Sequence, residues 1–290
     1  MLIDSVFPEM VEAKSNLTTC LTTQATARGL RPQQITTLIS IIPQPLSEAG
    51  AFLDKLTGIW RYEFGTPYRL GDSLVWGTHM WEEVSHLLDA LLCVHCRVPE
   101  SKRAPYLRLL SNPSKHQQTL VEMIPATKVD KNVAVDFEVG GLGNGNRTVD
   151  WVIGPHGGRT VLCDVKRRTS DFLAQFERLD DSQVAPEPNH DPAVLFRNVE
   201  HKFRSRDPDE YLQGAWIVTD IAQQDNRLLH AFLALDPTKV HFAILGDWQS
   251  DAHVLVRTED DRPYIRDLFR ITASSRFVFS TEDELTLARI

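Results

Sequence analysis

Three short runs rich in β-branched residues, close together in the chain, constrain its fold more than any other feature. They cover residues 132–139, 147–153 and 159–167. Clusters rich in glycine and asparagine separate the runs, and such clusters favour turns. The second cluster, residues 154–158, is short, so the last two runs are predicted to form an antiparallel hairpin.

Helical and strand patterns alternate after the hairpin. Helices are predicted over residues 171–179, 192–203 and 227–235, and buried strands over 215–219 and 241–245. Residues 252–290 mix both signals and give no clear order. A mixed sheet with helices on its faces follows, which is an α/β fold.

The N-terminal part of the chain has helical character. Residues 1–60 are predicted to hold one helix from Pro32 to Ile42 and a second that Ser47 caps. Residues 61–77 are rich in glycine, proline and aromatic residues and predict a loop or short strands. We therefore expect a helical region over residues 1–65 and a second domain over 66–290. A further amphipathic helix is predicted over 78–98, with a polar helical stretch after it.

The hairpin carries an unusual set of charges. Asp164 and Lys166 are two residues apart on one predicted strand, so their side chains point to the same face. Asp150 precedes Asp164 by fourteen residues, and in a hairpin without a bulge a loop of odd length puts both carboxylates on one face. A five-residue loop centred on His156 and Gly157 meets this condition.

Two facing carboxylates repel one another and need a positive partner. Lys166 supplies one charge, and a divalent cation is the natural second, because Mg²⁺ binds one or two carboxylates and keeps its waters. The carbonyl of Val165 is a further candidate ligand. A metal held by Asp150 and Asp164 beside a lysine suits phosphodiester hydrolysis, with Mg²⁺ or Mn²⁺ as the cofactor.

Asp150 followed by Asp164-Val165-Lys166 resembles the PD-(D/E)xK nuclease superfamily, which has the restriction-endonuclease-like fold. The resemblance covers roughly residues 79–246, and the motif itself lies within 138–168. Val149 stands where the proline of the family's name would be. The resemblance implies a nuclease whose catalytic residues include Asp150, Asp164 and Lys166, with DNA a more frequent substrate than RNA.

The resemblance also implies an acidic residue on a preceding helix. At 100° per residue, Glu83 lies at the edge of the apolar face of the predicted helix, and Glu82 lies on the opposite side. Glu83 is therefore expected to complete the acidic cluster as a catalytic and metal-binding residue. Glu138, on the strand before Asp150, is the rival candidate.

Basic residues near the hairpin suggest contacts with a phosphate backbone. Arg167 and Arg168 directly follow Lys166 and are the candidate substrate-binding residues. A second group is also typical of a solvated helix face; it consists of Arg197, His201, Lys202, Arg204 and Arg206. The formal net charge of −8 excludes a surface that coats nucleic acid everywhere, although a local basic groove remains compatible with it.

The composition suggests a cytoplasmic protein. Four cysteines in 290 residues form no disulfide framework, and no apolar stretch is long enough to cross a membrane. The sequence thus predicts a metal-dependent nuclease, for which a homodimer would be one way to cut both strands of a duplex. The alternative is a catalytically inactive binding or assembly module on the same fold, which the negative charge favours.

Overall fold

The computed structural model describes residues 11–65, 68–70, 73–75, 81–168, 191–219, 226–248 and 252–271. It divides the chain into two compact units, Met1–Met123 and Ile124–Ile290. Both units combine helices with sheet, which confirms the predicted α/β class. The helix predicted over 171–179 and the last part of the tail, 272–290, lie outside the described residues.

The first unit contains a four-stranded antiparallel sheet in the order β1-β2-β3-β6. Two further short strands, β4 and β5, pair with each other. The strands are β1 (Val11–Asn16), β2 (Gly50–Asp54), β3 (Trp60–Glu63), β4 (Tyr68–Leu70), β5 (Ser73–Val75) and β6 (Trp81–Glu83). The helices are α2 (Leu17–Ala27), α3 (Pro32–Ser40), the 3₁₀ turn η2 (Leu46–Glu48), α4 (Val84–Cys96), α5 (Glu100–Leu110) and α6 (His116–Glu122).

The N-terminal prediction is right for the helix from Pro32, but it is wrong for residues 11–16, which form β1, and after Ser47. The predicted helix from Pro32 is α3, but the residues assigned to the next helix form β2 and β3. The side chain of Asp54 explains the difference, because it accepts hydrogen bonds from Leu56 N and Thr57 Oγ1, both at 2.8 Å. A side-chain-capped turn of this kind competes with helix and reverses the chain into an antiparallel strand.

The division of the chain also differs from the predicted boundary at residue 65. Arg61 of β3 pairs with Glu83 of β6, so residues on both sides of that boundary belong to one sheet. The units instead divide after Met123. The same pairing shortens the helix predicted over 78–98, because residues 81–83 are held in the sheet and α4 begins at Val84.

The second unit contains a six-stranded sheet in the order β12-β11-β10-β9-β8-β7. Strands β7, β8 and β9 form an antiparallel meander, and β10 then lies parallel to β9. The strands are β7 (Val135–Val139), β8 (Val149–His156), β9 (Arg159–Arg167), β10 (Tyr211–Val218), β11 (Phe242–Leu245) and β12 (His253–Val256), and the helices are α7 (Ile124–Lys128), α9 (Pro192–Glu200), α10 (Asn226–Leu233) and α11 (Asp261–Leu268). The predicted hairpin and the predicted strands after it are confirmed.

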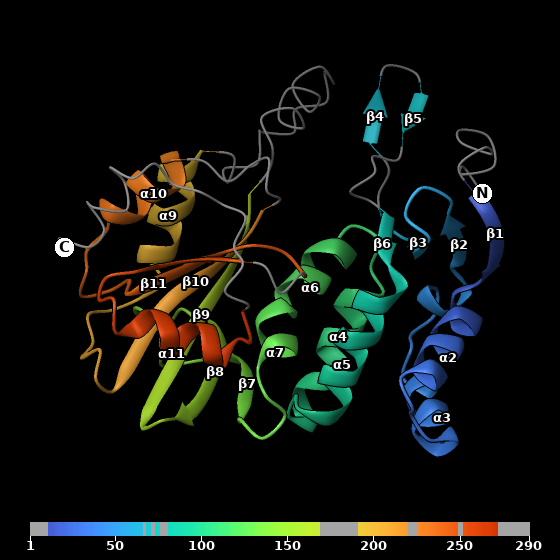
Figure 1. The fold of residues 1–290 in the computed structure, drawn as a ribbon, viewed down its shortest axis with the longest axis horizontal. Coiled ribbons are helices and arrows are strands. Elements are labelled where there is room, and N and C mark those ends of the chain that lie inside the picture. The colour runs from blue at the N-terminus through green and yellow to red at the C-terminus, as the bar shows by residue number, and fades with distance from the viewer. Residues whose placement is uncertain are drawn as a thin grey trace. The chain divides into compact units, whose positions relative to one another are not determined.

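Helices cover both faces of this sheet. Leu195 and Phe196 of α9 and Phe232 of α10 pack in one cluster with Ala215 and other buried residues of the sheet. Trp216, which follows Ala215 on β10, points to the opposite face of the sheet. There it packs edge-on against Phe269, the residue just after α11. Figure 1 shows α9 and α10 together on one side of the sheet and α11 on the other. Among the described residues, no helix has the length and apolar character that a membrane crossing requires.

Candidate functional site

Asp150 and Asp164 lie on the central hairpin of the second unit, on β8 and β9. Trp151 pairs with Cys163, and one step further along this register Asp150 is opposite Asp164. The ladder between the strands ends there, and Asp150 Oδ2 accepts a hydrogen bond of 2.8 Å from Val165 N. The two carboxylates therefore lie on one face of the sheet, as the spacing predicts.

The hairpin reaches this register by another route than the expected five-residue loop. The strands continue to His156 and Arg159, so the turn contains only Gly157 and Gly158. A two-residue turn alone would place Asp150 opposite Val165. One extra residue on β8, between Ile153 and His156, shifts the register and restores the pairing of the two aspartates.

Gly154 makes the register shift possible. Its φ of +104° is a conformation that residues with a side chain rarely adopt, and an added Cβ would lie 2.7 Å from His156 N. Contacts with α11 hold the end of the hairpin: Tyr264 Oη donates to His156 O at 2.7 Å, and Arg159 pairs with Asp261 at 2.6 Å. The parity of the hairpin, and with it the site, depends on this glycine.

Two lysines neutralise the two aspartates. Lys202 Nζ lies 2.7 Å from Asp150 Oδ1 and also donates to Asp164 Oδ1, so its ammonium bridges both carboxylates. Lys166 Nζ lies 2.5 Å from Asp164 Oδ2 and 3.1 Å from the carbonyl oxygen of Val165. The site is a cluster of two carboxylates and two ammonium groups, and Lys202 is the member that sequence reasoning assigned to a solvated surface.

Lys202 follows the end of α9, and two hydrogen bonds fix its backbone. Its N–H donates to Val199 O at 3.0 Å, and its carbonyl accepts from Asn144 N at 2.7 Å. The second bond comes from the glycine-rich turn between β7 and β8. At Gly143 in that turn, a Cβ would lie 2.5 Å from Arg147 O and 3.1 Å from Lys202 O, so this close approach requires glycine.

Burial and charge shift the pKa values of the cluster. Complete burial and the charge of Asp150 raise the pKa of Asp164 to about 7, against the opposing effect of both lysines. Burial also raises the pKa of Asp150, but its hydrogen bond with Asp164 and the charges of Lys202 and Lys166 outweigh burial and lower it. Burial lowers the pKa of Lys202, but the two carboxylates outweigh that effect and raise it. Lys202 therefore stays charged at physiological pH.

The donors of the cluster fit a hydrated divalent cation. Two carboxylates and the Val165 carbonyl are the oxygen ligands that Mg²⁺ and Mn²⁺ prefer, with water in the remaining positions. Asp164 Oδ2 is buried and, in the described part of the chain, has no hydrogen-bond partner, although Lys166 lies beside it as an ion pair. The described residues contain no group of three or more His, Cys, Asp or Glu side chains arranged for a metal. The described part of the chain thus offers two side-chain ligands, and the Lys202 ammonium contacts both.

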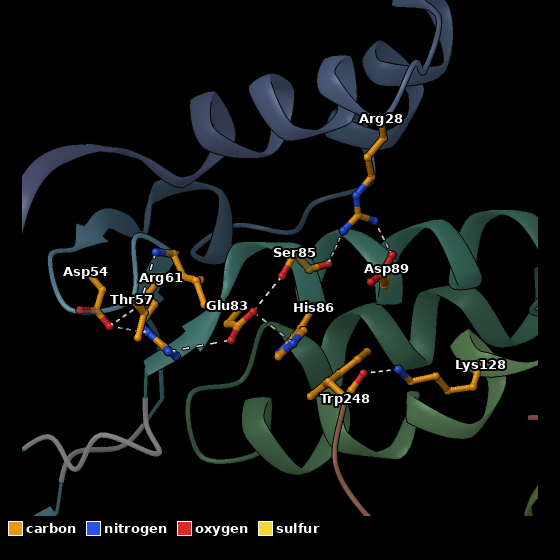
Figure 2. A network of polar contacts seen from close by, with 11 residues as sticks. Arg28, Asp54, Thr57, Arg61, Glu83, Ser85, His86, Asp89, Lys128 and Trp248 are labelled. Carbon is orange, nitrogen blue, oxygen red and sulfur yellow. Dashed lines mark hydrogen bonds and ion pairs between the residues drawn. The ribbon is translucent and has the colours of Figure 1, made fainter. Parts of the chain in front are cut away.

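Glu83 lies in the first unit, at the junction of β6 and α4. Its carboxylate is 3.9 Å from Arg61 Nη2 and 3.3 Å from His86 Nε2, and it accepts a hydrogen bond of 3.1 Å from Ser85 Oγ. Arg61 in turn donates to Asp54 at 3.1 Å. Figure 2 shows Glu83 between Arg61 and His86. This carboxylate has its own partners within the first unit, and its role beside the aspartates stays a prediction.

Glu138 lies on β7, on the other side of Asp150 from Asp164. Phe137 pairs with Trp151, and Val139 pairs with Val149. Glu138 lies between the first two residues of these pairs and is therefore opposite Asp150. However, Glu138 has a φ of +49°, which breaks the regular strand, and its side chain is exposed. The structure therefore does not group Glu138 with the two aspartates as a set of metal ligands.

The predicted substrate-binding arginines differ in exposure. Arg168 is only 5% exposed, and its backbone N–H donates to Val218 O at 3.0 Å, whereas Arg167 is half-buried. In the second basic group, Arg206 donates to Leu142 O and stacks on Tyr211, and three side chains remain exposed: Arg197, His201 and Arg204. Contact with a substrate stays a prediction for all of these residues.

Comparison with known proteins gives no further guide to the site. No protein-family model, no curated protein and no solved structure matches this chain. The functional interpretation consequently depends on the chemistry of the aspartates and lysines described above.

Proposed function

We propose that this chain is a metal-dependent nuclease that hydrolyses phosphodiester bonds in nucleic acid, DNA rather than RNA. The observation that carries the proposal is the pairing of Asp150 with Asp164 on adjacent strands, with Lys166 against Asp164. The order of elements supports it: a three-stranded meander, a helix, and a strand parallel to the last strand of the meander. That order agrees with the restriction-endonuclease-like fold implied by the PD-(D/E)xK resemblance.

In this proposal, Asp150, Asp164 and the Val165 carbonyl hold Mg²⁺ or Mn²⁺. When bound, such a cation polarises a phosphoryl oxygen and lowers the pKa of a water molecule. Hydrolysis forms a bond from the water oxygen to phosphorus and breaks the bond from phosphorus to a sugar oxygen. Lys166, whose side chain is 17% exposed, would orient that water and offset charge on the phosphate.

The same geometry also supports one alternative. Two carboxylates and two ammonium groups can neutralise one another without a metal, and such a cluster can serve only to fix the arrangement of β8, β9 and α9. The protein would then be a binding or assembly module without turnover. This alternative predicts no binding of divalent cations at millimolar concentration and no cleavage.

A cleavage assay separates the two proposals. Plasmid DNA, single-stranded DNA and RNA are incubated with the wild type, with Lys166→Ala and with Lys239→Ala, each with Mg²⁺ or Mn²⁺. Among the residues that the structure describes, Lys239 forms an ion pair only with Asp236, so Lys239→Ala is the matched control. The nuclease proposal predicts cleavage by the wild type and by Lys239→Ala, and loss of it in Lys166→Ala. No cleavage of any substrate, together with no metal binding by calorimetry, would favour the binding module.

A further inference from the structure

Lys202 contacts both carboxylates that are the proposed metal ligands. Its ammonium bonds to one oxygen of Asp150 and to one of Asp164, and no other described residue bridges the two side chains. A divalent cation bound to the same pair would meet the positive charge of Lys202 at close range. Because two like charges a few ångströms apart repel strongly at low dielectric constant, the cation and the ammonium compete.

We propose that Lys202 is a displaceable internal counter-ion, which holds the two aspartates together before the metal arrives and must withdraw from them when the metal binds. The inference rests on the proposed metal site and adds a mode of regulation to it: metal binding is coupled to movement of the Lys202 side chain.

Charge balance supports this coupling. With both aspartates ionised, the two lysines make the cluster neutral. A divalent cation added to that cluster would leave two uncompensated positive charges in a largely buried site, which is costly. If Lys202 withdraws and one phosphodiester group enters, the remaining charges sum to zero. Metal and substrate phosphate therefore favour each other's binding, and Lys202 opposes metal binding alone.

The local structure lets the side chain move while the backbone stays fixed. Hydrogen bonds from the backbone of Lys202 to Val199 and from Asn144 hold its Cα in place. The side chain is 21% exposed, whereas that of Asp164 is fully buried. Lys202 can thus rotate toward solvent, or toward a bound phosphate, without any change in α9. Lys166 remains beside Asp164 and keeps one positive charge in the cluster.

The test measures metal affinity directly, by calorimetric titration of Mn²⁺ into the metal-free protein. The variants are Lys202→Met, which removes the charge and keeps the length, Lys202→Arg, which keeps the charge, and Lys239→Met as a surface control. Removal of the ammonium should raise Mn²⁺ affinity by about tenfold or more. Lys202→Arg and Lys239→Met should not raise it. Equal or weaker Mn²⁺ binding by folded Lys202→Met would overturn the inference.

A second measurement does not depend on the folding of Lys202→Met. In wild-type protein labelled with ¹⁵N-lysine, the Lys202 ammonium should give a slowly exchanging NMR signal, assigned by its loss in Lys202→Arg. Addition of Mg²⁺ should shift or remove this signal. A signal unchanged while calorimetry shows Mg²⁺ bound would overturn the inference.

Cleavage is scored separately, so that the two proposals can fail separately. Tighter metal binding by Lys202→Met without cleavage by any variant would uphold the inference and refute the nuclease. Cleavage by the wild type, together with an unchanged Mn²⁺ affinity in Lys202→Met, would uphold the nuclease and refute the inference about Lys202. No metal binding by either protein would overturn both.

Discussion

Gly154→Ala should damage the site from a position that contacts neither aspartate. The φ of Gly154 is +104°, and an added Cβ would lie 2.7 Å from His156 N and 3.2 Å from Arg159 O. A strained backbone conformation of this kind costs about 1–3 kcal/mol, and the steric contact adds to that cost. The hairpin can relieve the strain by giving up the bulge, so that β8 shifts by one residue relative to β9. Asp150 would then face Val165, and Asp164 would turn to the opposite face.

Gly158→Ala is the matched control, because Gly158 has a φ of +85° in the same hairpin and its Cβ would meet nothing within 4 Å. Because the cost of a positive φ is common to both variants, urea unfolding should show Gly154→Ala less stable than Gly158→Ala by the steric contribution alone, about 1–3 kcal/mol. Mn²⁺ titration should show lost affinity in Gly154→Ala only. Equal stabilities and unchanged metal affinity in the two variants would refute the link between the register shift and the site.

Three further predictions concern the second unit. As pH rises from the ordinary carboxyl pKa of 3.8 to about 7, the folded protein keeps a proton on Asp164 that the unfolded chain has lost. The free energy of unfolding should therefore fall over this pH window by roughly 1–4 kcal/mol. Urea unfolding of Asp164→Asn at several pH values should show no such fall. A fall that persists in this variant would show that Asp164 is not its cause. Arg257→Met removes hydrogen bonds of 2.7 Å to Phe232 O and 3.0 Å to Leu235 O at the C-terminal end of α10, and should cost about 2–4 kcal/mol in thermal unfolding. A loss below about 0.5 kcal/mol would contradict this prediction. Gly214→Ala places a Cβ 2.2 Å from Phe242 O and should cost about 2–3 kcal/mol in the same assay. Wild-type stability of this variant would contradict the prediction, because it would show that β10 and β11 can move apart to admit the methyl group.

The sequence was most informative where local patterns and tertiary structure agree. The β-rich runs and the glycine clusters of residues 132–167 predicted three strands and the hairpin of the last two, and the even spacing of Asp150 and Asp164 predicted their common face. The turn itself was predicted wrongly. A two-residue turn combined with an extra strand residue has the same parity as a five-residue loop, so the spacing alone cannot distinguish them.

Lys202 shows why one of the four members of the cluster was assigned to the surface from the sequence. It lies beside His201, near Arg204 and Arg206, in a run that is typical of an exposed helix end. Its contact with the aspartates depends on the packing of α9 against the sheet and on the turn at Gly143. Neither this packing nor this close approach can be predicted from the local sequence around Lys202. A signal was nevertheless present, because two buried carboxylates with one lysine needed a second cation, and a lysine can supply it.

The N-terminal residues illustrate a tertiary override of local pattern. Phe52, Leu53 and Leu56 have spacings that suit a helix, but residues 50–54 pair with β1 and β3. Leu56 lies in the turn and is 78% exposed. Short apolar runs of this kind favour helix and strand about equally, so the partner strands decide.

Asp164→Ala, compared with the wild type, offers the simplest decision on whether the aspartate pair is a metal-dependent hydrolytic centre. Plasmid cleavage is measured with Mg²⁺ or Mn²⁺ on proteins that circular dichroism shows to be folded. We predict that Asp164→Ala lowers the cleavage rate by about a hundredfold or more and abolishes calorimetric Mn²⁺ binding. Metal-dependent cleavage at the wild-type rate by folded Asp164→Ala would contradict the assignment.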